Sequence, residues 1–186
     1  MRYFIELSYD GSPFVGWQRQ PKGDSVQSCL EDALKTLLQK PISVVGAGRT
    51  DAGVHARQLF AHVDLDDQVD QNLKFRLNKL LPKEIAVNSI LAVTDDAHAR
   101  FDATGRRYSY HITTQKDPFL KKRSYYFSKT LDIELMNQAA TDMLDHDDFK
   151  CFSKSRTDVK TYLCDIQEAY WEQNGSDLVF FIQANR

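Results

Sequence analysis

The residues best suited to chemistry lie in one short stretch, 46–56, which reads GAGRTDAGVHA. Its three glycines allow sharp backbone turns and the close approach of a ligand. Arg49 and Asp51 place opposite charges two residues apart in the same turn. The stretch lacks the Gly-Lys-Ser/Thr ending of a phosphate-binding loop, and its glycine spacing does not fit the dinucleotide fingerprint. The pattern therefore disfavours nucleotide triphosphate binding and makes Asp51 the candidate for carboxylate chemistry.

Two roles are open to Asp51 on the residues alone. Its carboxylate can hold the turn through hydrogen bonds to nearby backbone amides, and composition alone favours this structural role. A carboxylate can also stabilise a developing positive charge, act as a nucleophile or accept a proton. A glycoside hydrolase would need a second acid, such as Asp10, about 5 to 10 Å away, and no spacing in the sequence demands that pair.

The first half of the chain alternates between strand and helix patterns. Period-two alternation predicts strands, and apolar residues three and four positions apart predict helices. We expect Asp24 to cap the first helix, with Gln27 completing a capping box. The expected elements are a strand at 3–9, a helix at 26–38, strands at 42–47 and 58–65, a helix at 73–81 and a strand at 85–93. This βαββαβ order predicts a ferredoxin-like domain over 1–97 with an antiparallel sheet, two helices on one face and, by analogy with RNA-binding modules, RNA on the other.

The second half, 98–186, is expected to be a further α+β domain. Asp132 is placed to cap a helix, and Asn174-Gly175 is typical of a hairpin turn. The expected strands are 106–114, 124–128, 162–171 and 178–184. By analogy with the first half, one more helix and strand would follow, so we expect this domain to be incomplete at its C-terminus.

Composition limits the other possibilities. The formal net charge of −2 argues against a bulk electrostatic nucleic-acid binder, so an RNA site has to be a local patch. The three cysteines and the scattered histidines have neither disulfide-framework nor metal-site spacing, and we expect neither metal nor cofactor. With neither a signal peptide nor a membrane-spanning run in its pattern, the chain is expected to be cytoplasmic. The basic clusters available for RNA are 106–107, 121–123 and 154–156.

Several blocks of the sequence together resemble the tRNA pseudouridine synthase A family. The stretch 46–56 is similar to the family signature that holds the catalytic aspartate, which corresponds to Asp51. The other similar blocks are 9–20 for the family's opening, 25–31 for its first helix, 98–110 for its second motif and 181–186 for the start of its third. The resemblance thus extends from one end of the chain to the other.

The resemblance implies roles for further residues. Tyr108 would stack on the flipped uracil, and Arg49 would fill the space that the base leaves and bind backbone phosphate. We expect Arg100 and Arg106 of the second motif to contact the RNA as well. Trp17 and Arg19 are placed either to meet the tRNA or to form an N-terminal turn packed on the sheet, and the sequence does not decide between the two. On the residues alone, a strand aromatic in a core is the favoured interpretation of Tyr108, and a surface ion pair is the alternative for Arg49.

The implied activity is the isomerisation of uridine to pseudouridine in the anticodon stem-loop of tRNA, by a homodimer and without a cofactor. In the family, an arginine of the third motif pairs with the catalytic aspartate, and Arg186 matches only the beginning of that motif. We therefore expect this chain to be weakly active or inactive, because a buried carboxylate without a nearby cation tends toward a raised pKa and protonation. The alternative is a ferredoxin-like module that binds RNA without altering it.

Overall fold

The structure, a computed structural model, describes residues 1–66, 68–153 and 161–185. The chain divides into two compact units, unit 1 (Met1–Ala103) and unit 2 (Thr104–Arg186). Each unit combines one sheet with helices, so the α+β class predicted from the sequence is confirmed. Within the described ranges, every helix is too short or too polar to cross a membrane.

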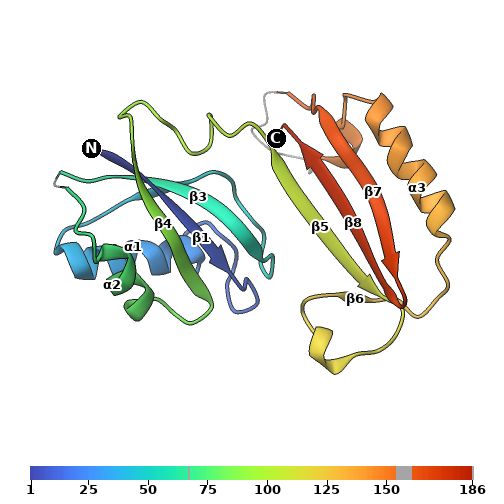
Figure 1. Cartoon of the computed structure of the whole chain (residues 1–186), viewed down its shortest axis with the longest axis horizontal. Coiled ribbons are helices and arrows are strands. Elements are labelled where there is room, and N and C mark those ends of the chain that lie inside the picture. The colour runs from blue at the N-terminus through green and yellow to red at the C-terminus, as the bar shows by residue number, and fades with distance from the viewer. Residues whose placement is uncertain (67, 154–160, 186) are drawn as a thin grey trace. The chain divides into compact units, whose positions relative to one another are not determined.

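Unit 1 has the predicted βαββαβ order. Its sheet runs β2-β3-β1-β4, all pairs are antiparallel, and both helices lie on the same face (Figure 1). This is the split βαβ arrangement of ferredoxin-like domains, as predicted. The elements are β1 (Arg2–Tyr9), α1 (Val26–Leu38), β2 (Val44–Gly46), β3 (Ala56–Asp64), α2 (Leu73–Leu80) and β4 (Ile85–Val93).

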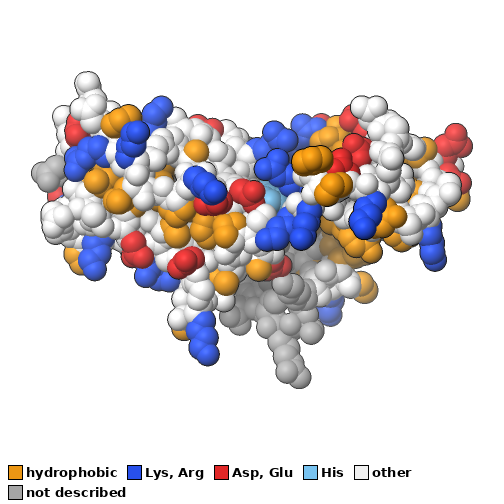
Figure 2. All heavy atoms as spheres, turned by 90° about the horizontal axis from the view of Figure 1, so that it is seen from below, with side chains coloured by type: hydrophobic (Ala, Val, Ile, Leu, Met, Phe, Trp, Pro, Cys, Tyr) orange, Lys and Arg blue, Asp and Glu red, His pale blue; other side chains and the backbone are white. Residues whose placement is uncertain are grey.

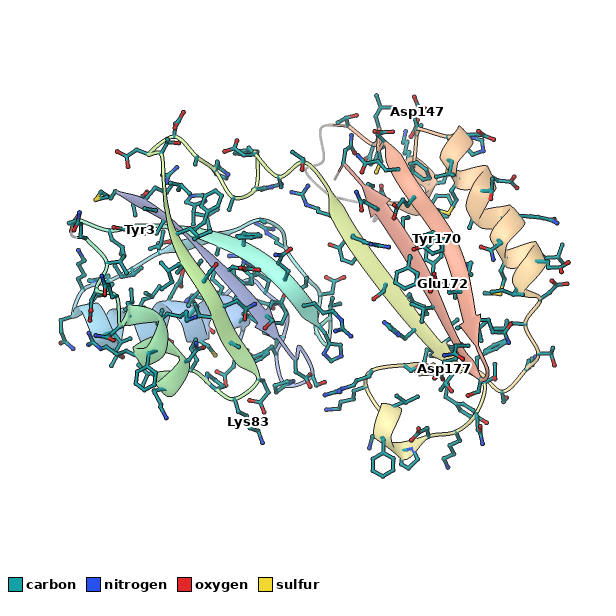
Figure 3. The ribbon with its side chains drawn as sticks, viewed as in Figure 1. Tyr3, Lys83, Asp147, Tyr170, Glu172 and Asp177 are labelled. Atoms are coloured by element: carbon teal, nitrogen blue, oxygen red, sulfur yellow. The ribbon has the colours of Figure 1, made fainter. Side chains whose placement is uncertain are left out.

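Alternation along β1 explains which face of this sheet is buried. Every second residue from Tyr3 to Tyr9 is buried, because successive strand side chains point to opposite faces. These residues pack with the apolar stripe of α1, in which Val26, Leu30 and Leu34 have no exposed surface. Figure 3 shows Tyr3 on this strand.

The start of α1 differs from the prediction. Ser25, not Asp24, is the N-cap residue, and Ser28, not Gln27, completes the capping box. The chain at 15–17 bonds to the chain at 24–27, and the Asp24 carbonyl accepts from the Val15 amide. The cap therefore lies one residue later than predicted, while α1 begins at Val26 as predicted. A serine hydroxyl is short enough to reach the amide three residues on, which is why serine is a favoured cap.

The other face of the unit 1 sheet carries a row of aromatic rings. The ring centroid of Phe4 lies 6.4 Å from those of Phe60 and His62, and the ring centroids of His98 and His62 are 4.5 Å apart. The Ala99 amide donates to His62 Nδ1 at 3.2 Å. Burial, followed by the charges of Arg2 and His98, lowers the pKa of His62. The chain around His98 therefore packs on the helix-free face through a neutral imidazole.

Unit 2 has the strand order β6-β5-β8-β7, with β5 and β6 parallel and the other pairs antiparallel. The α-helix lies along β7 (Figure 1), where the Asn137 amide bonds both backbone groups of Trp171. The predicted cap Asp132 is confirmed, since it accepts from two amides of the first turn. The elements are β5 (Arg106–Thr113), β6 (Tyr125–Tyr126), α3 (Ile133–Asp142), β7 (Ile166–Asn174) and β8 (Asp177–Ala184), with short 3-10 helices at Pro118–Leu120, Met143–Asp145 and Lys150–Phe152.

Two strand predictions for unit 2 need correction. The strand predicted at 162–171 begins only at Ile166, and the one predicted at 124–128 has two residues. Asn174 pairs with Asp177, so the hairpin turn consists of Gly175 and Ser176 rather than Asn174 and Gly175. Gly175 has φ +60°, which a glycine adopts without the steric penalty of a side chain. Figure 3 shows Tyr170 and Glu172 on β7 and Asp177 at the start of β8.

Candidate active site

The candidate carboxylate lies on the loop between β2 and β3, residues 47–55, which we call the Asp51 loop. Asp51 is exposed. The Val54 amide donates to the Asp51 carbonyl at 3.2 Å, and Gly53 has φ +79°, so the chain reverses tightly just after Asp51. At the base of the loop, the Ala47 amide donates to the Phe60 carbonyl at 2.7 Å. The loop therefore extends a hairpin and presents Asp51 to solvent.

One anchor holds the loop immediately before Asp51. The Tyr9 hydroxyl lies 2.9 Å from Thr50 Oγ1, and the Trp17 amide donates to the Thr50 carbonyl at 3.1 Å. Gly16 has φ +110°, and a Cβ there would collide with the same carbonyl. Only glycine allows the chain at 16–17 to approach the loop this closely.

The indole of Trp17 fills the space beneath this anchor. Trp17 is 1% exposed, and a Cβ added at Gly46 would lie 2.5 Å from its ring. The missing side chain at Gly46 thus makes room for the indole at the end of β2. Of the two alternatives left open for Trp17, its burial supports the turn packed on the sheet.

A second anchor holds the loop after Asp51. The Gly11 amide donates to His55 Nδ1 at 3.2 Å, and Asp10 Oδ1 lies 3.0 Å from the same nitrogen. A Cβ at Gly11 would collide with the Val54 carbonyl. Both anchors come from one segment, residues 9–17, which joins the end of β1 to the turn before α1.

Polar groups of α1 fix the chain next to this segment. The buried Gln27 and Glu31 side chains bond the two backbone groups of Val44 in β2. The Arg19 guanidinium donates to Asp32 and to Glu31, each at 2.8 Å, and these bonds raise its pKa. Arg19 is therefore engaged with α1 while its side chain stays 47% exposed. Its contact with tRNA stays a prediction.

The remaining predicted site residues lie in several places. Arg49 is exposed on the Asp51 loop, and Arg100 is exposed with its guanidinium 5.7 Å from the Phe101 ring. Arg106 and Tyr108 belong to β5 in unit 2, where Arg106 donates to the Asn185 carbonyl at 3.2 Å. The structure thus brings Arg49 and Asp51 together in unit 1. The cluster 154–156 and Arg186 lie outside the described residues.

Tyr108 lies at the edge of the unit 2 core. It is directly opposite Ile182 of β8, and Ile182 packs against the core beside α3. Opposite residues of an antiparallel pair share a face, so the ring of Tyr108 is on that face. It is nevertheless 49% exposed. The position leaves about half of the side chain accessible to a ligand.

Sequence reasoning did not assign Tyr9, Asp10 or His55 any role in supporting the loop. The only available signal was their place in the blocks 9–11 and 46–56, both of which are rich in glycine. A glycine indicates that its backbone can lie close to another group, but the sequence does not identify the carbonyl that it approaches. The contacts that join these blocks span about forty residues, and no periodic pattern reveals them.

The described residues outside the Asp51 loop carry other surface features. Among the residues that the structure describes, no three His, Cys, Asp or Glu side chains form a metal-binding group. Two shallow depressions lie in unit 2, one along α3 and one around Cys164, and neither is lined by a predicted site residue. Figure 2 shows basic and acidic side chains interspersed over the face in view.

Comparison with known proteins gives consistent matches. A family model described as tRNA pseudouridine synthase matches residues 7–102. The chain is 51% identical over 187 residues to tRNA pseudouridine synthase A of Parabacteroides distasonis, covering all of this chain and 74% of the relative. It is 50% identical to the protein of the same name from Bacteroides thetaiotaomicron, with 100% and 70% covered. It is 33% identical to tRNA pseudouridine synthase A 2 of Clostridium perfringens, with 97% and 75% covered.

Proposed function

The chain belongs to the tRNA pseudouridine synthase family, and we propose that it isomerises uridines in the anticodon stem-loop of tRNA with Asp51 as its catalytic carboxylate. Membership makes it an isomerase, which disfavours the alternative of an RNA-binding module without catalysis. The observation that carries the role of Asp51 is its place: an exposed carboxylate on a loop that is anchored on both sides.

The chemistry explains why such a placement is useful. The bond between ribose C1′ and uracil N1 breaks, the base turns, and C1′ bonds to C5, which loses its proton while N1 gains one. Nothing is oxidised or transferred between molecules. Breaking the bond puts positive character on the sugar, and a carboxylate can stabilise it, attack it or remove a ribose proton. A carboxylate whose backbone is already fixed needs little reorganisation for any of these routes.

The other predicted residues would hold the RNA. The half-exposed ring of Tyr108 offers a plane for the flipped uracil, and unstacking that base costs a few kcal/mol that contacts must offset. The cations Arg49, Arg100 and Arg106 would contact the backbone or fill the vacated stack, which fits a protein whose net charge requires a local patch. A homodimer and a cytoplasmic location are further parts of this proposal. The resemblance supports the homodimer, and the pattern of the N-terminal residues supports the location.

The test compares Asp51→Asn with Asp24→Asn. Both changes remove one charge from an exposed aspartate of unit 1, and Asp24 belongs to the turn before α1 rather than to the Asp51 loop. We expect Asp51→Asn to lower tritium release from tRNA labelled at uracil C5 by about 10³-fold or more, and Asp24→Asn to leave it unchanged. Binding of tRNA should stay equal or tighten in Asp51→Asn, because a negative charge near phosphates is lost. Normal release by Asp51→Asn would refute its catalytic role.

The position of the modified uridines needs a separate measurement. Carbodiimide treatment followed by primer extension maps pseudouridine along a tRNA transcript. We expect stops in the anticodon stem-loop and their loss when the uridines there are replaced by cytidine. Stops elsewhere in the same transcript would refute the proposed substrate region while leaving the role of Asp51 intact.

A further inference from the structure

We propose that His55 is a positioning residue for the reaction, acting through its Nδ1 atom to hold the Asp51 loop against residues 10–11. This inference rests on the proposed catalytic role of Asp51. The observation behind it is that one ring nitrogen lies within hydrogen-bond distance of two groups, the Gly11 amide at 3.2 Å and Asp10 Oδ1 at 3.0 Å.

The groups that His55 meets are themselves fixed. The Asp10 amide donates to the Glu84 carbonyl at 2.9 Å, just before β4. Asp10 Oδ1 also accepts from the Ser12 amide at 2.9 Å, which closes a local turn. Because Asp10 is bonded to the backbone on both sides, a bond to this turn ties His55 to the sheet rather than to a loose loop.

The pairing of β1 with β3 places His55 at the end of the ladder. Tyr9 is paired with Ala56, after an irregularity between Leu7 and Tyr9, and this is the last pair of the register. The contact of His55 with residues 10–11 continues the two strands by one step through a side chain. The backbone of β3 is therefore anchored as far as His55, which lies four residues after Asp51 in the sequence.

The two contacts of Nδ1 require opposite protonation at that atom. A bare Nδ1 accepts from the Gly11 amide, whereas a protonated Nδ1 donates to the Asp10 carboxylate. Both states tie the same atom to the same turn, so the position of the polar atom matters more than the charge of the ring. An asparagine side chain places a polar atom near Nδ1, and a glutamine side chain places one near Nε2. The two substitutions thus separate the two ring nitrogens.

Loss of this tie should affect chemistry more than substrate binding. Thr50 would stay anchored by Tyr9 and Trp17, so the loop would keep its upstream side and lose its downstream one. A displacement of about 1 Å at a reacting group can cost about 10²-fold in rate. Substrate affinity depends on phosphate and base contacts spread over the protein, and one loop anchor contributes little to it.

The experiment compares His55→Asn and His55→Gln with the unaltered chain. We expect His55→Gln to lower kcat for tritium release by about 10²-fold with KM changed by less than about threefold, and His55→Asn to restore kcat to within about fivefold of the unaltered chain. Equal losses of kcat in both variants, or a loss carried by KM, would overturn the proposal.

A second measurement does not depend on turnover. Amide hydrogen exchange by NMR should be about tenfold faster at Gly11 and Val54 in His55→Gln, and unchanged in His55→Asn, because only the former loses the bond at Nδ1. Unchanged exchange at both amides in His55→Gln would sink the inference. Asp51→Asn is measured in parallel, because its normal turnover would refute the proposed function, whereas normal turnover by His55→Gln alone refutes only the role of His55.

Discussion

The two units bury very different amounts of apolar surface. The core of unit 1 contains large side chains such as Trp17 and Leu34, which are almost or entirely without exposed surface. Several aromatic residues of unit 2 are about half exposed, among them Tyr108 at 49% and Tyr110 at 53%, while others such as Trp171 are only partly buried. Among the described residues of unit 2, the buried core cluster consists of small or medium side chains, Ala140, Ile166, Ala169 and Ala184, and Leu178 is buried as well.

Because of this difference, the two predicted site residues Asp51 and Tyr108 lie on parts of the protein with different stability. Free energy from burial grows with the apolar area removed from water, at about 25 cal/mol per Å². Unit 1 should therefore be the more stable unit, and the Asp51 loop is anchored to it. Tyr108 projects from the less stable unit, where local opening is easier. We infer that the Asp51 carboxylate is held rigidly and that the ring of Tyr108 has more freedom.

The largest expected effect is on the free energy of unfolding when the tryptophan of each unit is replaced by alanine. Trp17→Ala should destabilise unit 1 by about 3 to 5 kcal/mol, because it leaves a large cavity beneath the Thr50 anchor. Trp171→Ala should cost unit 2 less, because that indole is only partly buried, with its ring centroid 5.0 Å from that of Phe180. Urea unfolding of each variant, followed by circular dichroism, gives the two free energies.

The same residues supply the controls. Trp171→Phe leaves Trp17 as the only tryptophan, so fluorescence follows unit 1, and Trp17→Phe makes it follow unit 2. We expect the unit 2 signal to change at lower urea than the unit 1 signal. A common midpoint would show that the units unfold together, and a larger loss in Trp171→Ala would reverse the assignment of stability.

A smaller effect is expected from two glycines with positive φ. Gly16→Ala should cost about 2 to 3 kcal/mol, because the new Cβ meets the Thr50 carbonyl at φ +110°. Gly175→Ala in the unit 2 hairpin should cost only about 1 kcal/mol, because no atom lies within 4 Å of its Cβ position and the backbone penalty acts alone. The free energy of unfolding of each unit, followed by its own tryptophan, measures both costs.

The two glycine variants should also differ in their rates of tritium release. Gly16→Ala should also slow tritium release, since the strain falls on the residue next to Asp51. Gly175→Ala should leave release unchanged. Equal costs at the two positions would mean that the chain at 16–17 can move away from the loop, which would weaken the case for a rigid Asp51.

The order and faces of the unit 1 elements could be predicted because their signals are local. The alternation in β1 and the stripe in α1 each arise from the period of one element, and the βαββαβ order then leaves few ways to pair the strands. The error at the helix cap has the same origin. Asp24 and Ser25 are both good caps, and the choice between them is made by bonds from residues 15–17, which no local pattern contains.

For the candidate site, the sequence singles out residues but does not predict how they are arranged. Glycine and charge drew attention to Asp51, while the anchors at Thr50 and His55 depend on contacts across the sheet. Trp17 illustrates the limit, because an aromatic beside cationic residues suits RNA and a core equally well. Burial supports the core, and burial depends on where Gly46 lies in the fold.

The smallest expected effect is a pH dependence confined to unit 1. Burial first, then Arg2 and His98, lowers the pKa of His62, outweighing the opposite effect of Asp64. Stability linked to His62 is therefore full above its unfolded pKa of about 6.5 and is lost as the pH falls toward the lower folded pKa. In the Trp171→Phe background, we expect the urea concentration at the unfolding midpoint, reported by Trp17 fluorescence, to decrease as the pH is lowered below about 6.5. His62→Asn keeps an acceptor for the Ala99 amide without titrating, so an equal fall in that variant would exclude His62 as the cause.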